Sequence, residues 1–209
     1  MNRLRAIIKP LQKILKGRDR GSVAIQFILT LPILLTILGV LVQYALLVNA
    51  KLTMERALAS AARSAMTALP TNQMLGEAGG PDAVRRAALM VLESLSPKAE
   101  SEVSTEAQTV ANALASVGLP PPDGTYAARY TYAQAATEVS ISGGNYATSP
   151  GERITLTISY DFRLTVPGVN ALIGRSDTVA GIEGRFRRFT SSVEVQLSPG
   201  REAGTGGAP

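Results

Sequence analysis

The sequence predicts an α+β protein that is held in a membrane by one long N-terminal helix. Three observations lead to this prediction. A charge-free apolar run over residues 21–50 follows a basic arm, helical periodicity continues to about residue 118, and a two-residue alternation then takes over. We therefore expect a transmembrane helix that continues into a domain of short helices and an antiparallel sheet, with the helices covering one face of the sheet.

The positive charge is concentrated in the first 20 residues. They contain seven Lys and Arg and one acid, whereas the rest of the chain has 14 basic and 15 acidic residues. A nucleic-acid-binding module spreads its basic residues over a folded surface, so we expect no nucleic-acid partner. A short polybasic segment before an apolar run is typical of the cytoplasmic flank of a membrane helix. The sequence thus predicts a basic cytoplasmic leader over residues 1–20, with everything after about Ala50 outside the cytoplasm.

The apolar run is long enough to cross a bilayer once. Residues 23–48 are dominated by Val, Ile, Leu and Phe, and a hydrocarbon core of ~30 Å needs about 20 helical residues. A cleavable secretory signal has a shorter core, of roughly 7 to 15 residues. We therefore predict a transmembrane helix over residues 21–50. Pro32 removes a backbone donor inside this helix, so a kink or local loosening is expected. Two explanations of the proline stay open: transmembrane helices tolerate proline in general, or a bend at this position is needed for packing in an assembly.

Helical periodicity continues beyond the membrane. Pro70 is expected to end the long helix. A second helix then opens at Pro81, and a third opens with Ser96 as N-cap and Pro97 in the first turn, to be terminated by Gly118. The apolar stripe of the long helix consists of Leu47, Met54, Leu58, Ala61, Ala65 and Leu69.

Strand patterns follow the proline-rich link at 119–124. Residues 126–133 and 137–142 are predicted strands, and the clearest alternation of apolar and polar residues lies between Ile154 and Phe162. Residues 185–197 form a further extended segment. The tyrosines expected to share one face of the first strand are Tyr126, Tyr130 and Tyr132.

Residues 164–174 contain Pro167 and Gly168, which predicts a loop with one turn of helix. The domain organisation that follows is an extracytoplasmic α+β domain over residues 51–197. A small-residue, Gly-rich tail over 198–209 is expected to be disordered.

No catalytic, cofactor or metal site is expected. The chain lacks Cys and His, which removes the thiolate nucleophile and the commonest general base and transition-metal ligand. No phosphate loop, dinucleotide fingerprint or nucleophile elbow is present. The simplest interpretation of Glu100 and Glu102 is a solvated helix start. For Arg185 and Arg187 we expect either solvated side chains or contact with an acidic partner. A further class of function stays open, that of a membrane-tethered hydrolase with an unusual Ser/Lys or carboxylate site.

One part of the sequence resembles a known family. RGSVAIQFILTLPILL combines a basic arm, Gly21, an apolar run and a proline eleven positions after the glycine, and ERALASAARSA follows as an Ala/Arg-rich helix. Over roughly residues 18–66 this resembles the TadE-type pseudopilins of the Tad (tight adherence) pilus system. RITLTISYDFRLTVPGV, residues 153–169, is a weaker echo of that family.

The resemblance implies a pilin-like fold and processing by a prepilin peptidase, which would cut between Gly21 and Ser22 on the cytoplasmic side. It also implies partners among pilin or pseudopilin subunits and the inner-membrane pilus machinery. The expected location is the bacterial inner membrane, crossed once, with a periplasmic C-terminal domain. Incorporation in an extracellular pilus is compatible with it.

Gln26 departs from the family pattern. In this family and in type IV pilins the fifth residue after the cut is glutamate, whose carboxylate pairs with the terminal amine of a neighbouring subunit. Gln26 avoids the cost of a charge in the apolar layer, and its carbonyl still accepts a hydrogen bond. Gln26 and Pro32 are therefore the candidate helix-assembly residues. We expect a non-enzymatic minor pseudopilin rather than a repeating fibre subunit; the alternative is a generic single-pass, membrane-anchored periplasmic binding or scaffold protein with no pilus role.

Overall fold

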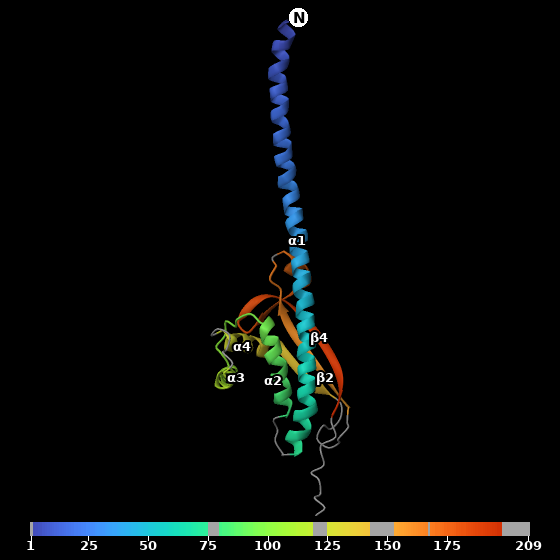
Figure 1. Ribbon diagram of the computed structural model, residues 1–209, viewed down its shortest axis with the longest axis vertical. Coiled ribbons are helices and arrows are strands. Elements are labelled where there is room, and N and C mark those ends of the chain that lie inside the picture. The colour runs from blue at the N-terminus through green and yellow to red at the C-terminus, as the bar shows by residue number, and fades with distance from the viewer. Residues whose placement is uncertain (1, 75–79, 119–124, 143–152, 167, 198–209) are drawn as a thin grey trace, which may run out of the picture.

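The computed structural model describes residues 2–74, 80–118, 125–142, 153–166 and 168–197, with side chains described from residue 26 and not over 70–74. Figure 1 shows one long helical rod whose first half stands clear of the other elements, while its second half lies beside a second helix and a sheet. The elements in chain order are α1 (Asn2–Met74), α2 (Gly80–Leu92), η1 (Glu93–Leu95), α3 (Thr105–Ser116), α4 (Tyr126–Ala136), β1 (Thr137–Ser142), β2 (Arg153–Arg163), α5 (Val169–Ile173), β3 (Arg175–Val179) and β4 (Ile182–Gln196).

The α+β prediction is confirmed by an antiparallel sheet in the order β1-β2-β4-β3. The central strand β2 pairs with β1 on one side and with β4 on the other. Its alternation places five side chains on the core face, each at most 7 % exposed: Ile154, Leu156, Ile158, Tyr160 and Phe162. β1 has the predicted bounds, and β4 contains most of the extended segment predicted over 185–197.

α1 is continuous over 73 residues, roughly 110 Å of helix. The basic arm therefore belongs to the same helix as the apolar run. The expectation that Pro70 ends the helix is wrong, because α1 continues to Met74. A proline removes one hydrogen bond but has a φ value that suits a helix. The residue before it, Leu69, is held by packing against α2, where a Cβ added to Gly80 would lie 3.1 Å from Leu69 Cδ2.

The environment of α1 changes along its length. Residues 26–38 are exposed on every side of the helix, whereas a stripe beginning at Gln43 is buried by α2 and the sheet. Most of that stripe is alanine, and small side chains allow the helix to lie close to its neighbours. The residues of the stripe that are at most 3 % exposed are Gln43, Ala50, Met54, Ala57, Ala61, Ala65 and Leu69.

The third helix does not open at Ser96 and Pro97 as predicted, because Ser96 and the segment after it form hydrogen bonds with other parts of the fold. The Ser96 hydroxyl donates back to the carbonyl of Leu92 at 2.9 Å and contacts the Tyr160 hydroxyl at 3.1 Å. The following backbone donates to the carbonyls of Ala128 and Ala180, so it is extended. α3 opens instead at Ser104, whose Oγ accepts from the N–H of Ala107 at 3.1 Å.

The strand predicted over residues 126–133 is wrong, because this segment forms the helix α4. Aromatic residues favour strands only where a pleated neighbour is available to pack against, and here alanines at intervening positions let a helix fit between α2, η1 and the sheet. Tyr126 and Tyr130 are one turn apart and stack, with ring centroids separated by 6.2 Å. Tyr132 lies on another side of the helix and donates to the carbonyl of Asp161 at 3.2 Å.

Other predictions of local structure are confirmed. α2 and η1 together cover the helix predicted from Pro81 to Leu95, and α5 is the single turn of helix predicted within 164–174. Gly118 has a φ of +74° after the end of α3, the left-handed conformation that glycine adopts at low cost. The link at 119–124 and the predicted disordered tail at 198–209 lie outside the described residues.

The head domain is joined to the membrane helix through Gln43. This side chain is 1 % exposed, and its Oε1 accepts the backbone N–H of Val166 at 3.0 Å. One turn before it, Gly39 leaves room for the loop, because an added Cβ would lie 3.3 Å from Val166 Cγ1. The loop after β2 is therefore held against α1 at the level where the helix changes from exposed to buried.

Gln43→Met is expected to destabilise the head domain by about 1 kcal/mol, because it removes the acceptor of a partly buried backbone N–H while keeping the side-chain volume. Thermal unfolding followed by tyrosine near-UV circular dichroism in detergent measures the effect. Gln108→Met, at an exposed position of α3, is the matched control. Equal melting temperatures for the two variants would contradict the assigned role of Gln43.

Candidate helix-assembly and membrane-anchoring site

The predicted processing junction lies within α1. The backbone is helical at Gly21 and Ser22, and their side-chain environments lie outside the described residues. A peptidase needs an extended substrate, so the helix would have to unwind locally before cleavage. Glycine lowers this cost, since it is about 1 kcal/mol less favourable than alanine in a helix interior. The assignment of the cleavage site stays a prediction.

Gln26 is exposed on α1, one turn after Ser22. Its backbone carbonyl accepts the Thr30 hydroxyl at 2.9 Å. Its side-chain amide has no hydrogen-bond partner in the part of the chain that the structure describes. Because Cα–Cβ bonds tilt toward the N-terminus of a helix, the amide is directed over the turn that contains Ser22. It is available to a group on a neighbouring helix.

The helix around Gln26 is apolar on all sides. Phe27, Ile28 and Leu29 are consecutive, so they lie about 100° apart around the axis, yet they are 63 %, 67 % and 66 % exposed. A core helix of a soluble domain would have one of these faces covered. α1 is long and apolar enough to span a membrane, and nearly all of its most apolar stretch lies outside the core. Lipid or other helices are the environments that suit such a surface.

Pro32 is exposed in the middle of this apolar segment, and the helical backbone continues through it. Its missing N–H leaves the carbonyl of Ile28 without the usual donor. Hydroxyl side chains satisfy neighbouring carbonyls: Thr36 Oγ1 donates to the Pro32 carbonyl at 2.8 Å. A role for Pro32 in helix packing stays a prediction.

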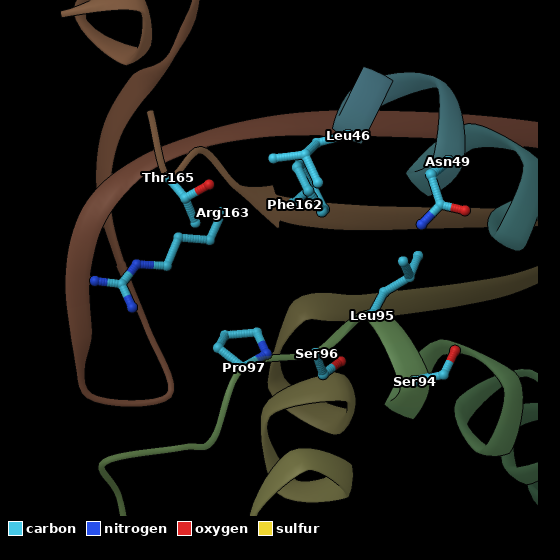
Figure 2. Close-up of a pocket in the computed structure, with 9 residues that line it drawn as sticks. All are labelled: Leu46, Asn49, Ser94, Leu95, Ser96, Pro97, Phe162, Arg163 and Thr165. Atoms are coloured by element: carbon cyan, nitrogen blue, oxygen red, sulfur yellow. The ribbon is translucent and has the colours of Figure 1, made fainter. Parts of the chain in front are cut away.

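A crevice flanks α1 where it meets the head domain (Figure 2). Its volume is about 280 Å³, and it is bounded by Leu46 and Asn49 of α1, the end of β2 and residues 94–97. None of the residues lining it is acidic. The crevice therefore offers hydrogen-bonding groups and apolar contacts, but no carboxylate pair for acid–base catalysis.

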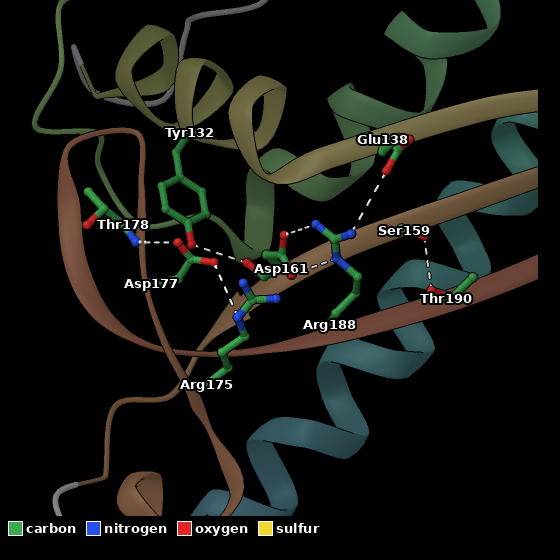
Figure 3. A network of polar contacts seen from close by, with 9 residues as sticks. All are labelled: Tyr132, Glu138, Ser159, Asp161, Arg175, Asp177, Thr178, Arg188 and Thr190. Carbon is green, nitrogen blue, oxygen red and sulfur yellow. Dashed lines mark hydrogen bonds and ion pairs between the residues drawn. The ribbon is translucent and has the colours of Figure 1, made fainter.

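Figure 3 shows the charged network on the sheet, which is structural in character. Arg188 and Asp161 are directly opposite each other on β4 and β2, and they form a two-point contact of 3.0 and 2.7 Å. Glu138 of β1 lies 4.0 Å from the same guanidinium. The hydrogen bonds that Arg188 donates to the Asp161 carboxylate raise the pKa of Arg188 above its ordinary value. The three strands are thereby cross-linked on their exposed face.

The other two arginines of β4, Arg185 and Arg187, have no acidic partner in the described ranges. Arg185 donates to the carbonyl of Gly174 at 3.1 Å, and Arg187 is exposed. Burial raises the pKa of Tyr160 to about 12, so its hydroxyl stays protonated as a partner for Ser96. Among the described residues, no group of three or more acidic side chains lies close enough together to hold a metal ion.

Sequence reasoning missed Gln43 as a positioning residue. The available signal was a polar residue inside the apolar run, seven positions before Ala50 and therefore on the face that the head domain buries.

No curated protein and no solved structure matches the chain. One family model matches the part of the chain that contains the predicted processing junction, Gln26, Pro32 and Gln43. Residues 21–63 match the model of TadE-like proteins, which confirms the resemblance to that family.

Proposed function

We propose that the protein is a non-enzymatic, pseudopilin-like component of a Tad-type pilus or a related secretion apparatus, which assembles through its N-terminal helix. Its basic leader is cytoplasmic, residues 21–50 contain the membrane crossing, and the α+β head is periplasmic. The family match at residues 21–63 supports the relation to pilus machinery. The observation that carries the proposal is the apolar surface of α1 over residues 26–38, which is exposed all round and is not covered by any other described part of the chain.

The head domain is built in a way that leaves this surface free. It holds α1 only from about Gly39 onward, through Val166 and the buried stripe that begins at Gln43. Roughly 20 residues separate Val23 from Gln43, which is the length that crosses a bilayer core. Neighbouring pilin-like helices therefore have access to the membrane half of α1 without displacing the head.

Gln26 sets the strength of this assembly. Cleavage after Gly21 creates a positively charged amine on Ser22 at the membrane border. Gln26 offers it a neutral acceptor, and hydrogen bonds with one charged group are weaker than those in which both groups are charged. The association is accordingly weaker than with glutamate, which suits a subunit that is used once or a few times in the machine.

Processing predicts that the protein purified from its host membranes lacks residues 1–21 and begins at Ser22. Gly21→Val is expected to abolish this mass loss. The β-branched valine side chain fits poorly in the cleft of the peptidase, and it makes local unwinding of the helix less favourable than glycine does. Intact-protein mass spectrometry gives the answer directly.

Gly17→Val, in the same leader, is the matched control and should leave processing unchanged. A full-length wild-type protein would support the plain membrane anchor instead.

Gln26→Glu is expected to strengthen association with pilin helices roughly tenfold, since an ion pair with the Ser22 amine replaces a hydrogen bond with a single charge and 1.4 kcal/mol corresponds to a factor of ten. Co-purification from membranes at matched expression measures the change. Gln26→Leu should weaken the association. A plain anchor would show no gain from glutamate.

Deletion of the gene is expected to abolish or strongly reduce surface pili, counted by electron microscopy, and complementation with the intact gene should restore them. Complementation with a chain lacking residues 51–209 should fail, because it retains the membrane helix without the head. Normal piliation in the deletion strain would overturn the proposed function.

A further inference from the structure

A second groove lies where α1 enters the head domain, on the side formed with α5 and β4. Its volume is about 460 Å³. One wall is the α1 segment from Val40 to Val48, and the other is formed by α5 and by Phe189 of β4. The walls are largely apolar, and Tyr44 and Val48 are 67 % and 40 % exposed. This wall is continuous with the lipid-exposed surface of α1.

Two cations line the groove. Lys51 follows the apolar wall on α1, and Arg187 projects from β4 on the face of the sheet that is directed toward α1. Both side chains are exposed, and neither has an ion-pair partner in the part of the chain that the structure describes. No acidic residue lines the groove. The groove thus combines apolar walls with two cations and no acidic side chain.

The position of the groove along the helix matches the outer edge of a bilayer. If the hydrocarbon core begins near Val23, it ends near Gln43 after about 20 residues. Lys51 lies eight residues further, roughly 12 Å along the axis, and long basic side chains extend back toward the interface. Lys51 therefore lies at the level of the phosphate groups, and Val40 at the level of the acyl chains.

A third observation concerns Gln43, which also lines this groove. Its Oε1 is engaged by Val166, but its buried Nε2 has no hydrogen-bond partner among the described residues. A buried amide donor of this kind is costly unless an acceptor is supplied. At the boundary of the hydrocarbon core, the ester carbonyl of a phospholipid is an acceptor of the right chemistry.

We propose that this groove binds one anionic phospholipid of the outer leaflet, with an acyl chain entering the bilayer along Val40, the glycerol region beside Tyr44 and Val48, and the phosphate within reach of the cations Lys51 and Arg187. The inference rests on the membrane placement in the proposed function. The lipid completes the junction between helix and head: it covers apolar surface that the head leaves open, and it fixes the height of the head above the bilayer.

The test uses the full chain in phosphatidylcholine vesicles doped with a phospholipid that carries a photoreactive diazirine in one acyl chain. The headgroup is phosphoglycerol in one arm and phosphocholine in the other. After irradiation, peptide mass spectrometry is expected to place anionic-lipid adducts on the α1 wall between Val40 and Val48, with far fewer adducts from the zwitterionic lipid. Lys51→Gln with Arg187→Gln should reduce anionic labelling roughly fivefold per cation removed.

Lys98→Gln with Arg153→Gln is the matched control, because it makes the same charge change at two exposed positions outside the groove, and its labelling should equal that of the wild type. Arg187→Lys keeps the charge and should retain most of the labelling. Equal labelling by the two lipids, or equal labelling of the two double variants, would overturn the inference.

Flotation of the same vesicles separates this inference from the proposed membrane placement. Protein that floats but labels without headgroup preference remains anchored and lacks the lipid site. Protein that does not float overturns the membrane placement and the lipid site together.

Discussion

The change of environment along α1, from exposed on all sides to packed against the head domain, is the constraint on which the rest of the structure depends. A helix satisfies its backbone hydrogen bonds internally, so one continuous helix is able to serve in both environments. Its side chains must nevertheless change near Gln43. Before that residue the surface is apolar all round, and after it one stripe is reduced to small residues so that the sheet and α2 approach closely. The buried side-chain oxygen of Gln43 needs a hydrogen-bond donor, and the head supplies it with the N–H of Val166. Docking of the head and placement of the helix are therefore coupled.

This coupling explains why the strongest sequence signals were correct. The apolar run stands clear of the head domain, and β2 has one face in the core of the fold, so tertiary contacts do not disturb the sequence pattern of either. Ser96 and the segment 126–133 are different, because two or more tertiary partners decide their structure. The Ser96 hydroxyl turns back to Leu92 and contacts Tyr160, and the tyrosines of α4 adopt helical geometry against elements that lie far away in sequence. Local propensity cannot anticipate such partners.

The candidate site divides in the same way. Gly21, Ser22, Gln26 and Pro32 were found from the sequence because the family motif is local, and the match at residues 21–63 confirms that relation without assigning a role to any of them. The groove beside α1 was not predicted, because Lys51 and Arg187 come together only through the pairing of β4 with β2 and the packing of both on α1. β3 was missed for a related reason. Its residues are exposed or half-buried, so no apolar alternation marks it, and its pairing with β4 depends on a turn at Ala180 and Gly181 with positive φ values.

In the proposed function, the continuity of α1 also determines how assembly in the membrane is transmitted to the head. Gln26 and Gln43 are 17 residues apart, roughly 25 Å along one helix, and no loop lies between them. A neighbouring helix that fixes the rotation and height of α1 at Gln26 therefore fixes the orientation of the head as well. Pro32 is the point at which this transmission is weakest, since one carbonyl there lacks its donor. A subunit built in this way presents its head in one direction for each arrangement of its helix, which is the property that a component with a fixed place in a machine requires.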